Sequence, residues 1–485
     1  MHRVGSCTFR TLRGSLLLTA ALSLLAARAG EAHKEAYADP KEAKQELRDR
    51  LKAPPAPKPP PELVPMPALT WASEKLKKLP LGSARFSFGI EHRTRVEVWD
   101  NKFLGAGATI TNGFTLFRHR VWMDADLHEH FRVFGMFQDA HKDGDIAPQA
   151  RAHEDRADLL EGYLDLRKLF GQDLTLRVGR QPLVYGRQRL VGAFEWSNPG
   201  RRFDALKLMW KSPDQAWTAD AFASKVVEID AIHPDEMHSS EEFYGLYATN
   251  ASLKPHRFDL YALYRSNEIK ERDQEIVTLG FRAYGKGIFG GLDYEVEAAG
   301  QFGKTPVGAD ELDHRAAAAH AEVGWTFAPA WKPRIMAEFN YASGDKDPTD
   351  GENQTFNNLF PTNHLHYGYA DFFNWSNQIS VAAGFEAQPL SGMTVWSKAY
   401  WFRLAEEKDA WRNAGGVVLA RDTTGRAGRE VGFEFDVGTT VNVNRHLNVD
   451  LGYALFDGGE FTGARRPPGQ GETAQFFWAQ AVLKF

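Results

Sequence analysis

The sequence has a single cysteine, Cys7, close to its start. Once a leader that contains it is removed, no thiol remains for disulfides, thiol catalysis or cysteine-based metal sites. Long apolar runs are also missing, since no segment approaches the roughly 18 apolar residues that a transmembrane helix needs. If the protein is integral to a membrane, it must therefore cross that membrane as a β-barrel.

Common catalytic motifs are absent as well. The sequence contains neither GxSxG nor HExxH, and its 16 histidines fall in no spacing that requires a zinc site. A literal GxGxxG match at 285–290 lies between two alternating segments without a βαβ unit, so it indicates a glycine-rich turn. We therefore expect no enzyme, no cofactor and no metal. An outer-membrane barrel enzyme stays open as an alternative.

Residues 1–29 have the three parts of a secretory signal peptide: a basic start, an apolar stretch and the sequence Ala27-Arg28-Ala29. We expect cleavage after Ala29. The formal charge of −5 includes four arginines and no acid in this segment, so the mature chain carries about −9. That charge disfavours a nucleic-acid partner. It does not decide the charge of a pore, because a solute responds to the local field of the lumen.

A segment of different composition follows the predicted signal peptide. Residues 54–61 read Pro-Pro-Ala-Pro-Lys-Pro-Pro-Pro, which forces an extended polyproline conformation. We expect residues 30–83 to form a disordered periplasmic arm, which is either a passive linker or a contact for peptidoglycan or a partner. Residues 84–485 are expected to form one domain.

From residue 84 onward, period-2 segments of about 9 to 14 residues alternate with turns rich in Gly, Pro, Asp and Asn. Phe88, Ile90 and Val96 share one face of the first segment, while Arg93 and Glu97 share the other. Charges inside and apolar residues outside predict an all-β protein, an antiparallel transmembrane barrel of about 18 strands, with 16 as the alternative. The expected strands are 86–98, 113–127, 131–140, 158–169, 173–184, 202–211, 216–226, 242–250, 257–266, 275–285, 291–303, 316–328, 332–343, 377–388, 392–404, 428–441, 446–457 and 473–485.

The last segment places Phe477, Leu483 and Phe485 on one face, and Gln480 and Lys484 on the other. An apolar face that ends on a terminal aromatic is typical of outer-membrane barrels, so we expect the outer membrane of a Gram-negative-type cell. An even strand count puts both termini in the periplasm. The connections near 99–112, 141–157, 185–201 and 343–377 would then lie outside, and loops of this length often fold inward.

Two blocks carry a family pattern. The first has GRQ at 179–181, YG at 185–186, QRLVG at 188–192, Trp196, Asn198, GR at 200–201 and FD at 203–204. The second has YASGD at 341–345, TFN at 355–357, LFPT at 359–362 and GYAD at 368–371. With Ala414-Gly415-Gly416, these blocks resemble the alginate export family of outer-membrane proteins over most of residues 84–485.

The resemblance implies a monomeric barrel whose basic constriction passes an anionic polyuronate out of the periplasm. It leaves open whether a periplasmic secretion complex feeds the barrel. The expected partners are therefore an anionic polysaccharide or small anions, together with outer-membrane lipid. A general or organic-anion-selective porin of the same fold is the main alternative.

Arginine suits such a pore, because its planar fork meets a carboxylate with two parallel hydrogen bonds. Our candidates for the lumen or its mouth are Arg118, Arg120, Arg177, Arg180, Arg187, Arg189, Arg201, Arg202, Lys207, Arg282 and Arg334, with Arg93 and Arg95 as further candidates. Alternatively, these cations pair with acids such as Glu91, Glu97, Asp124, Asp126, Glu161 and Asp165 and cross-brace the wall. Because Arg177 and Arg180 are an odd number of residues apart, one of them must lie at a bulge, at the rim or in the turn before Pro182.

Two further features have competing interpretations. The rings of Trp196, Tyr367, Tyr369 and Phe372 match the flat faces of sugars, but packing of loops or an interfacial girdle is the role we favour. The acids at 345–352 offer oxygen ligands without the spacing of an EF-hand, so we expect a solvated acidic loop there.

Overall fold

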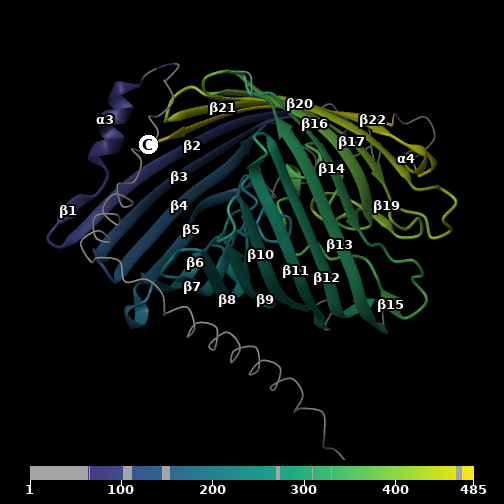
Figure 1. Ribbon diagram of the computed structural model, residues 1–485, viewed down its shortest axis with the longest axis horizontal. Coiled ribbons are helices and arrows are strands. Elements are labelled where there is room, and N and C mark those ends of the chain that lie inside the picture. Colours follow the sequence, from purple (N-terminus) through teal and green to yellow (C-terminus); the bar gives the residue numbers. More distant parts are fainter. Residues whose placement is uncertain are drawn as a thin grey trace, which may run out of the picture. The chain divides into compact units, whose positions relative to one another are not determined.

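The alternating segments form one closed antiparallel barrel of 18 strands (Figure 1). The computed structural model describes residues 64, 66–101, 112–144, 153–268, 273–307, 310–328, 330–465 and 472–485. All of them belong to one compact unit, Pro60–Phe485. The predicted signal peptide and most of the predicted arm lie outside the described residues.

Each of the 18 predicted segments overlaps one barrel strand. The barrel strands are β2 (Ala84–Asp100), β3 (Asn112–His128), β4 (Phe131–Asp143), β5 (Asp155–Leu166), β6 (Leu174–Gln181), β7 (Phe203–Lys211), β8 (Trp217–Glu228), β9 (Glu236–Asn250), β10 (His256–Glu268), β11 (Asp273–Ile288), β12 (Leu292–Val307), β13 (Asp310–Thr326), β14 (Arg334–Ala342), β16 (Gln378–Leu390), β17 (Met393–Arg403), β20 (Glu430–Asn442), β21 (Leu447–Gly458) and β22 (Thr473–Lys484).

The barrel closes where β22 pairs with β2, in a register that sets Phe477 opposite Val98 and Lys484 opposite Glu91. Phe477 is 43 % exposed on the outer surface, whereas Trp478 beside it is fully buried. Lys484 reaches inward to Glu91, with 2.9 Å between its Nζ and the carboxylate. The inward polar and outward apolar faces predicted from the alternation are confirmed, as a barrel wall in lipid requires.

The N-terminal end of the described chain adds two elements beside this closure, α3 (Pro67–Lys75) and β1 (Leu79–Leu81) (Figure 1). Leu79 pairs with Phe86 on the edge of β2 that extends past Phe485. From α3, Thr70 Oγ1 lies 3.1 Å from His446 Nε2, in the turn between β20 and β21. Ordered structure therefore begins before residue 84, within the segment that we assigned to the arm. No helix among the described residues is long and apolar enough to cross a bilayer.

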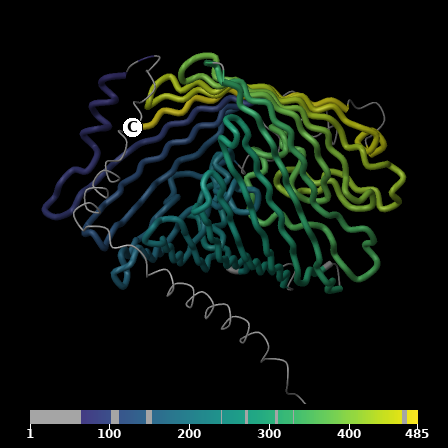
Figure 2. Tube along the Cα trace, in the orientation of Figure 1, coloured from purple at the N-terminus to yellow at the C-terminus, as the bar shows by residue number. Residues whose placement is uncertain are grey.

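The connections at the two ends of the barrel differ in length. At one end β16 passes to β17, and β20 to β21, through short turns, with the one-turn η2 (Leu169–Gly171) between β5 and β6. The other end carries the long connections, which we name the first inner loop (182–202), the second inner loop (343–377) and the third inner loop (404–429) (Figure 2). These loops and the last connection contain β15 (Glu352–Asn353), η3 (Asn363–Leu365), β18 (Ala410–Arg412), β19 (Val418–Arg421) and α4 (Glu460–Ala464).

Candidate functional site

The first and second inner loops fold into the lumen and bind each other there. Val191 and Phe360 form a parallel β-bridge. The backbone N–H of Gly192 donates to Phe360 O at 2.8 Å, and that of Thr362 donates to Gln188 O at 2.9 Å. Because both chain segments also contact inward-facing wall residues, they narrow the channel, as the long loops at this end led us to expect.

Glu195 of the first inner loop is the centre of a cluster of arginines from the wall and from the end of its own loop. Its carboxylate lies 3.1 Å from Arg118, 2.7 Å from Arg120 and 2.8 Å from Arg202. Arg93 donates to its backbone carbonyl at 2.8 Å. Burial by itself would raise the pKa of Glu195, but the guanidinium groups of Arg120, Arg202 and Arg118 hold that pKa well below its usual range.

The cluster carries an excess of positive charge. Arg118 also meets Glu91 at 2.7 Å, and Arg202 meets Glu161 at 2.9 Å. Four guanidinium groups therefore face three carboxylates, and Glu195 is still 45 % accessible. An accessible site inside a low-dielectric wall focuses this field on a passing solute.

Most of the predicted pore cations are engaged with acids. Nine of the candidates form ion pairs within 3.1 Å: Arg118, Arg120, Arg177, Arg180, Arg189, Arg202, Lys207, Arg282 and Arg334. The cross-braced wall that we gave as the alternative thus describes these positions. Arg187 is exposed and Arg201 half-buried, and neither has a carboxylate within ion-pair distance in the described part of the chain.

Arg180 is placed at the rim rather than inside the lumen. It shares a strand face with Val178, which is 37 % exposed on the outer surface, and it pairs with Asp204 at 3.0 Å. Arg177 faces inward, where it meets Asp165 at 2.7 Å and lies over the ring of Tyr163. The odd spacing of the two arginines is therefore explained by the position of Arg180 at the rim, while Arg177 faces the lumen.

Arg189 joins the first inner loop to the opposite wall. It is 2 % exposed, forms an ion pair with Glu295 and lies 3.6 Å from Glu297. Its Nη2 is 2.7 Å from Nε2 of His320. With both carboxylates on β12, this arginine is a structural anchor of the loop and not a free contact for a solute.

The second inner loop rests on aromatic rings and two buried acids. The ring of Tyr369 stacks on Trp478 with 4.4 Å between centroids. Its backbone N–H donates to Asp436 at 3.1 Å, and that of Ala370 donates to Glu434 at 2.8 Å. Gly368, at φ +87°, allows this close approach, because a Cβ there would lie 2.3 Å from Glu434.

The aromatic residues of the motif blocks serve to pack the loops. Trp196 stacks on His364 at 3.7 Å, and the guanidinium of Arg95 lies over its other face at 3.9 Å. Tyr367 and Phe372 are 0 % and 3 % exposed. With these faces covered, loop packing is the interpretation that the structure supports.

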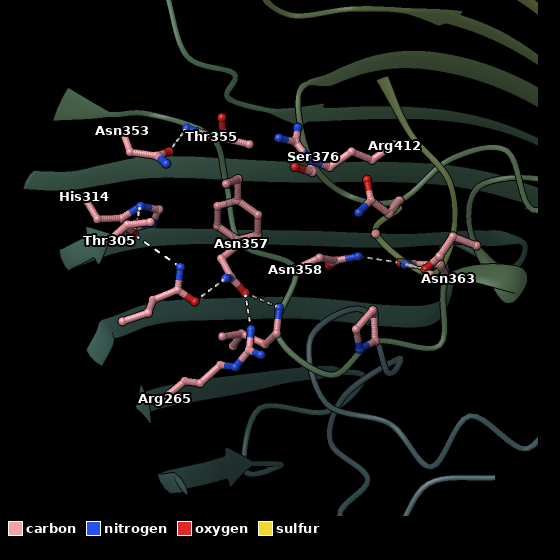
Figure 3. A pocket seen from close by; sticks show the side chains of 18 of the residues that line it. Arg265, Thr305, His314, Asn353, Thr355, Asn357, Asn358, Asn363, Ser376 and Arg412 are labelled. Carbon is pink, nitrogen blue, oxygen red and sulfur yellow. Dashed lines mark hydrogen bonds between the residues drawn. The ribbon is translucent and has the colours of Figure 1, made fainter. Parts of the chain in front are cut away.

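A polar pocket of about 420 Å³ opens between the inner loops and the wall formed by β10 to β13 (Figure 3). Three arginines line it, Arg201, Arg265 and Arg412, and no carboxylate does among the described residues. The remaining lining is mostly amides and hydroxyls: Gln274, Asn353, Asn357, Asn358, Asn363, Asn374, Thr305, Thr355 and Ser376, with His314.

Hydrogen bonds and ion pairs to neighbouring protein groups fix the arginines of the pocket. Arg265 Nε donates to Glu241 at 2.7 Å, while its Nη1 donates to the Asn357 side chain at 3.1 Å. Arg201 donates to Pro361 O at 2.9 Å. Arg412 lies 3.5 Å from Asp409. Each retains N–H groups beyond these contacts, since a guanidinium carries five donors.

Sequence reasoning named Arg201 but missed Arg265 and Arg412. Arg265 shares the inward face of β10 with Tyr261 and Leu263, which is a signal that alternation offers. Arg412 lies in the third inner loop, where no periodicity indicates direction. The acids at 345–352, by contrast, form no group of converging metal ligands within the described ranges.

The sequence profile of the alginate export family matches residues 84–477 of this chain. The chain belongs to the alginate export family. This confirms the resemblance of the two motif blocks. No curated protein matches the chain.

Solved structures of Pseudomonas aeruginosa proteins share the fold of this alginate export family member. OpdO is 14 % identical with a TM-score of 0.54, over 82 % of this chain and 97 % of OpdO. OccK8 (OprE) is 10 % identical with a TM-score of 0.56, over 82 % and 98 %. OpdK, solved with vanillate, is 11 % identical with a TM-score of 0.52, over 82 % and 98 %. Family and fold together support an outer-membrane channel.

Proposed function

We propose that this protein is a monomeric, passive outer-membrane channel for an anionic polysaccharide of the polyuronate type. The observation that carries the proposal is the polar pocket, where three arginines and a set of amides and hydroxyls converge and no described lining residue is a carboxylate. A polyuronate has one carboxylate and several hydroxyls on each sugar. Guanidinium groups suit the first, and amides and hydroxyls suit the second.

The pocket favours contacts of moderate strength. Its arginines already donate hydrogen bonds to protein acceptors. A passing carboxylate would therefore bind only their remaining N–H groups, and its affinity would be moderate. Moderate affinity suits a channel, because a translocating chain must leave each site as readily as it enters. The excess positive charge around Glu195 would draw the chain along the same lumen.

Passage of a polymer requires the inner loops to move. They bind each other at Val191 and Phe360 and cover the wall from Glu434 to Trp478. We therefore propose that the structure is the closed state of the channel and that displacement of the second inner loop opens it.

Replacing Arg412 by glutamine should weaken blockade of single-channel current by polyuronate oligomers on the order of tenfold, because a charge-assisted hydrogen bond is lost. Arg426→Gln is the matched control, with the same charge change in the same loop at an exposed position outside the pocket. Equal blockade of both variants would remove the pocket from the proposal. No blockade of the wild-type channel at millimolar oligomer would remove the polysaccharide.

A porin for small organic anions is the second candidate, and the volume of the pocket favours it. About 420 Å³ holds a small ligand completely, and OpdK of the same fold is a structure with vanillate. The two candidates differ in how blockade depends on length. A polysaccharide channel should bind longer oligomers more tightly, whereas a small-anion porin should bind the monomer as well as the polymer.

A further inference from the structure

Three aspartates converge at the long-loop end of the barrel, away from the polar pocket. Asp155 is the first residue of β5, Asp158 follows on the same strand, and Asp235 lies in the connection between β8 and β9. One carboxylate oxygen from each lies within 4.8 Å of the other two. Carboxylates at this separation repel one another unless a proton or a cation compensates them.

The three aspartates form no direct ion pair within the described part of the chain. None of the three aspartates has a lysine or arginine within ion-pair distance among the described residues. The guanidinium of Arg180 pairs with Asp204 at 3.0 Å and contacts Asp235 through that residue's backbone carbonyl, also at 3.0 Å, and not through its carboxylate. The cluster therefore holds three carboxylates whose nearest cations, Arg120 beside Asp155 and Arg180 beside Asp235, act on them only from beyond ion-pair distance.

Asp155 provides a second, separate indication of a missing ligand. It is 1 % exposed, and its Oδ1 has no hydrogen-bond donor among the described residues. Its Oδ2 is fixed by the Nε2 of Gln138 at 2.6 Å, so the free oxygen has a defined direction. Buried charges are paired or coordinate a metal, and an unpaired carboxylate oxygen at this depth is costly.

We propose that Asp155, Asp158 and Asp235 bind one Ca²⁺ ion. All the available ligands are oxygens and none is histidine or cysteine, which selects a hard cation over zinc or copper. Ca²⁺ accepts irregular sets of six to eight oxygens, so waters and backbone carbonyls can complete the shell that the three carboxylates begin. Mg²⁺ demands a near-ideal octahedron, which ligands constrained by other hydrogen bonds do not offer.

The ion would connect the rim to the arginine cluster of the lumen. Gln138, which orients Asp155, accepts a hydrogen bond from Arg120 Nε at 2.7 Å, and Arg120 pairs with Glu195. A cation here would tie the connection before β9 to β5. It would also cancel negative charge close to the positively charged constriction.

Calorimetric titration of Ca²⁺ into the purified, chelator-treated full-length protein in detergent tests the proposal. We expect one site with a dissociation constant below about 1 mM, as in extracellular calcium modules. Asp235→Asn should weaken binding at least about tenfold. Asp214→Asn, an exposed aspartate in the β7–β8 turn at the other end of the barrel, should bind like wild type.

Two outcomes would overturn the site: no heat from Ca²⁺ at a concentration well above that constant, or equal affinities of wild type and Asp235→Asn. Tighter binding of Mg²⁺ than of Ca²⁺ would overturn the choice of ion. The titration of the wild-type protein with Ca²⁺ tests the site by itself, so the proposal stays testable even if the Asp235→Asn variant does not fold. Because Ca²⁺ binds the folded state, its removal by chelator should lower Tm and its return should restore it.

Discussion

Replacing Glu195 by glutamine is expected to raise the preference of the channel for anions more than any other single change. The substitution removes the carboxylate that Arg118, Arg120 and Arg202 share, and keeps the size of the side chain. Four guanidinium groups would then face two carboxylates instead of three. In a focused field we expect the anion-to-cation permeability ratio to rise on the order of twofold or more.

Reversal potentials in a salt gradient measure this ratio. Glu228→Gln is the control, because it makes the same charge change at an exposed position near the rim of β8. If both variants keep the wild-type reversal potential, Glu195 does not lie on the conducting path.

Acidification should not reproduce the effect of the glutamine substitution in the ordinary range of carboxylate titration. Burial favours protonation of Glu195, yet Arg120, Arg202 and Arg118 keep its pKa well below the usual 4.5. A lowered folded-state pKa means that the pairing energy is present above 4.5 and is lost only as pH falls through the lower value. Anion selectivity that already rises as pH falls from neutral to 4.5 would contradict the charged cluster.

Excising the second inner loop should increase single-channel conductance several-fold, because this loop covers much of the lumen. The ends of the loop already meet, since Asn377 N–H donates to Ser343 O at 3.1 Å. Residues 344–376 can therefore be replaced by a short Gly/Ser linker without straining β14 or β16. Unchanged conductance of a correctly folded variant would show that the loop does not close the channel.

A point substitution offers a milder version of the same test. Gly368→Ala would bring its Cβ to 2.3 Å from Glu434, so the loop must lift from the two acids. Gly351→Ala is the matched control, because Gly351 also has a positive φ, of +84°, but nothing within 4 Å of the new Cβ. Any strain of left-handed backbone is then common to both. We expect more frequent openings for Gly368→Ala alone.

The barrel was predictable because the sequence pattern that specifies it is local. Period-2 alternation between lipid and lumen repeats in every strand, so each strand could be recognised from about ten residues. The rule fails where the register slips. Alternation alone would turn Val431 outward. Instead Phe402 pairs with Gly432 and Arg403 with Glu430, so Val431 is the extra residue of a bulge in β20 and is buried, at 0 % exposure.

The pore residues were harder to predict, for a different reason. The alternation predicts which arginines face the lumen, but it does not predict which inward-facing acid each of them pairs with. Arg189 finds Glu295 across 106 positions of the chain, and Arg120 finds Glu195 only because a loop folds back into the lumen. Arg187 and Arg201, which form no ion pair within the described ranges, look like the paired cations in the sequence.

The sequence by itself determined the strands, their two faces and the family, because each rests on a short repeating pattern or a contiguous motif. Only the tertiary structure decided which charges cancel, that the long loops enter the lumen, and that Arg201, Arg265 and Arg412 share one pocket. Those outcomes depend on distances between segments far apart in the chain. A pattern of period two contains no information about such distances.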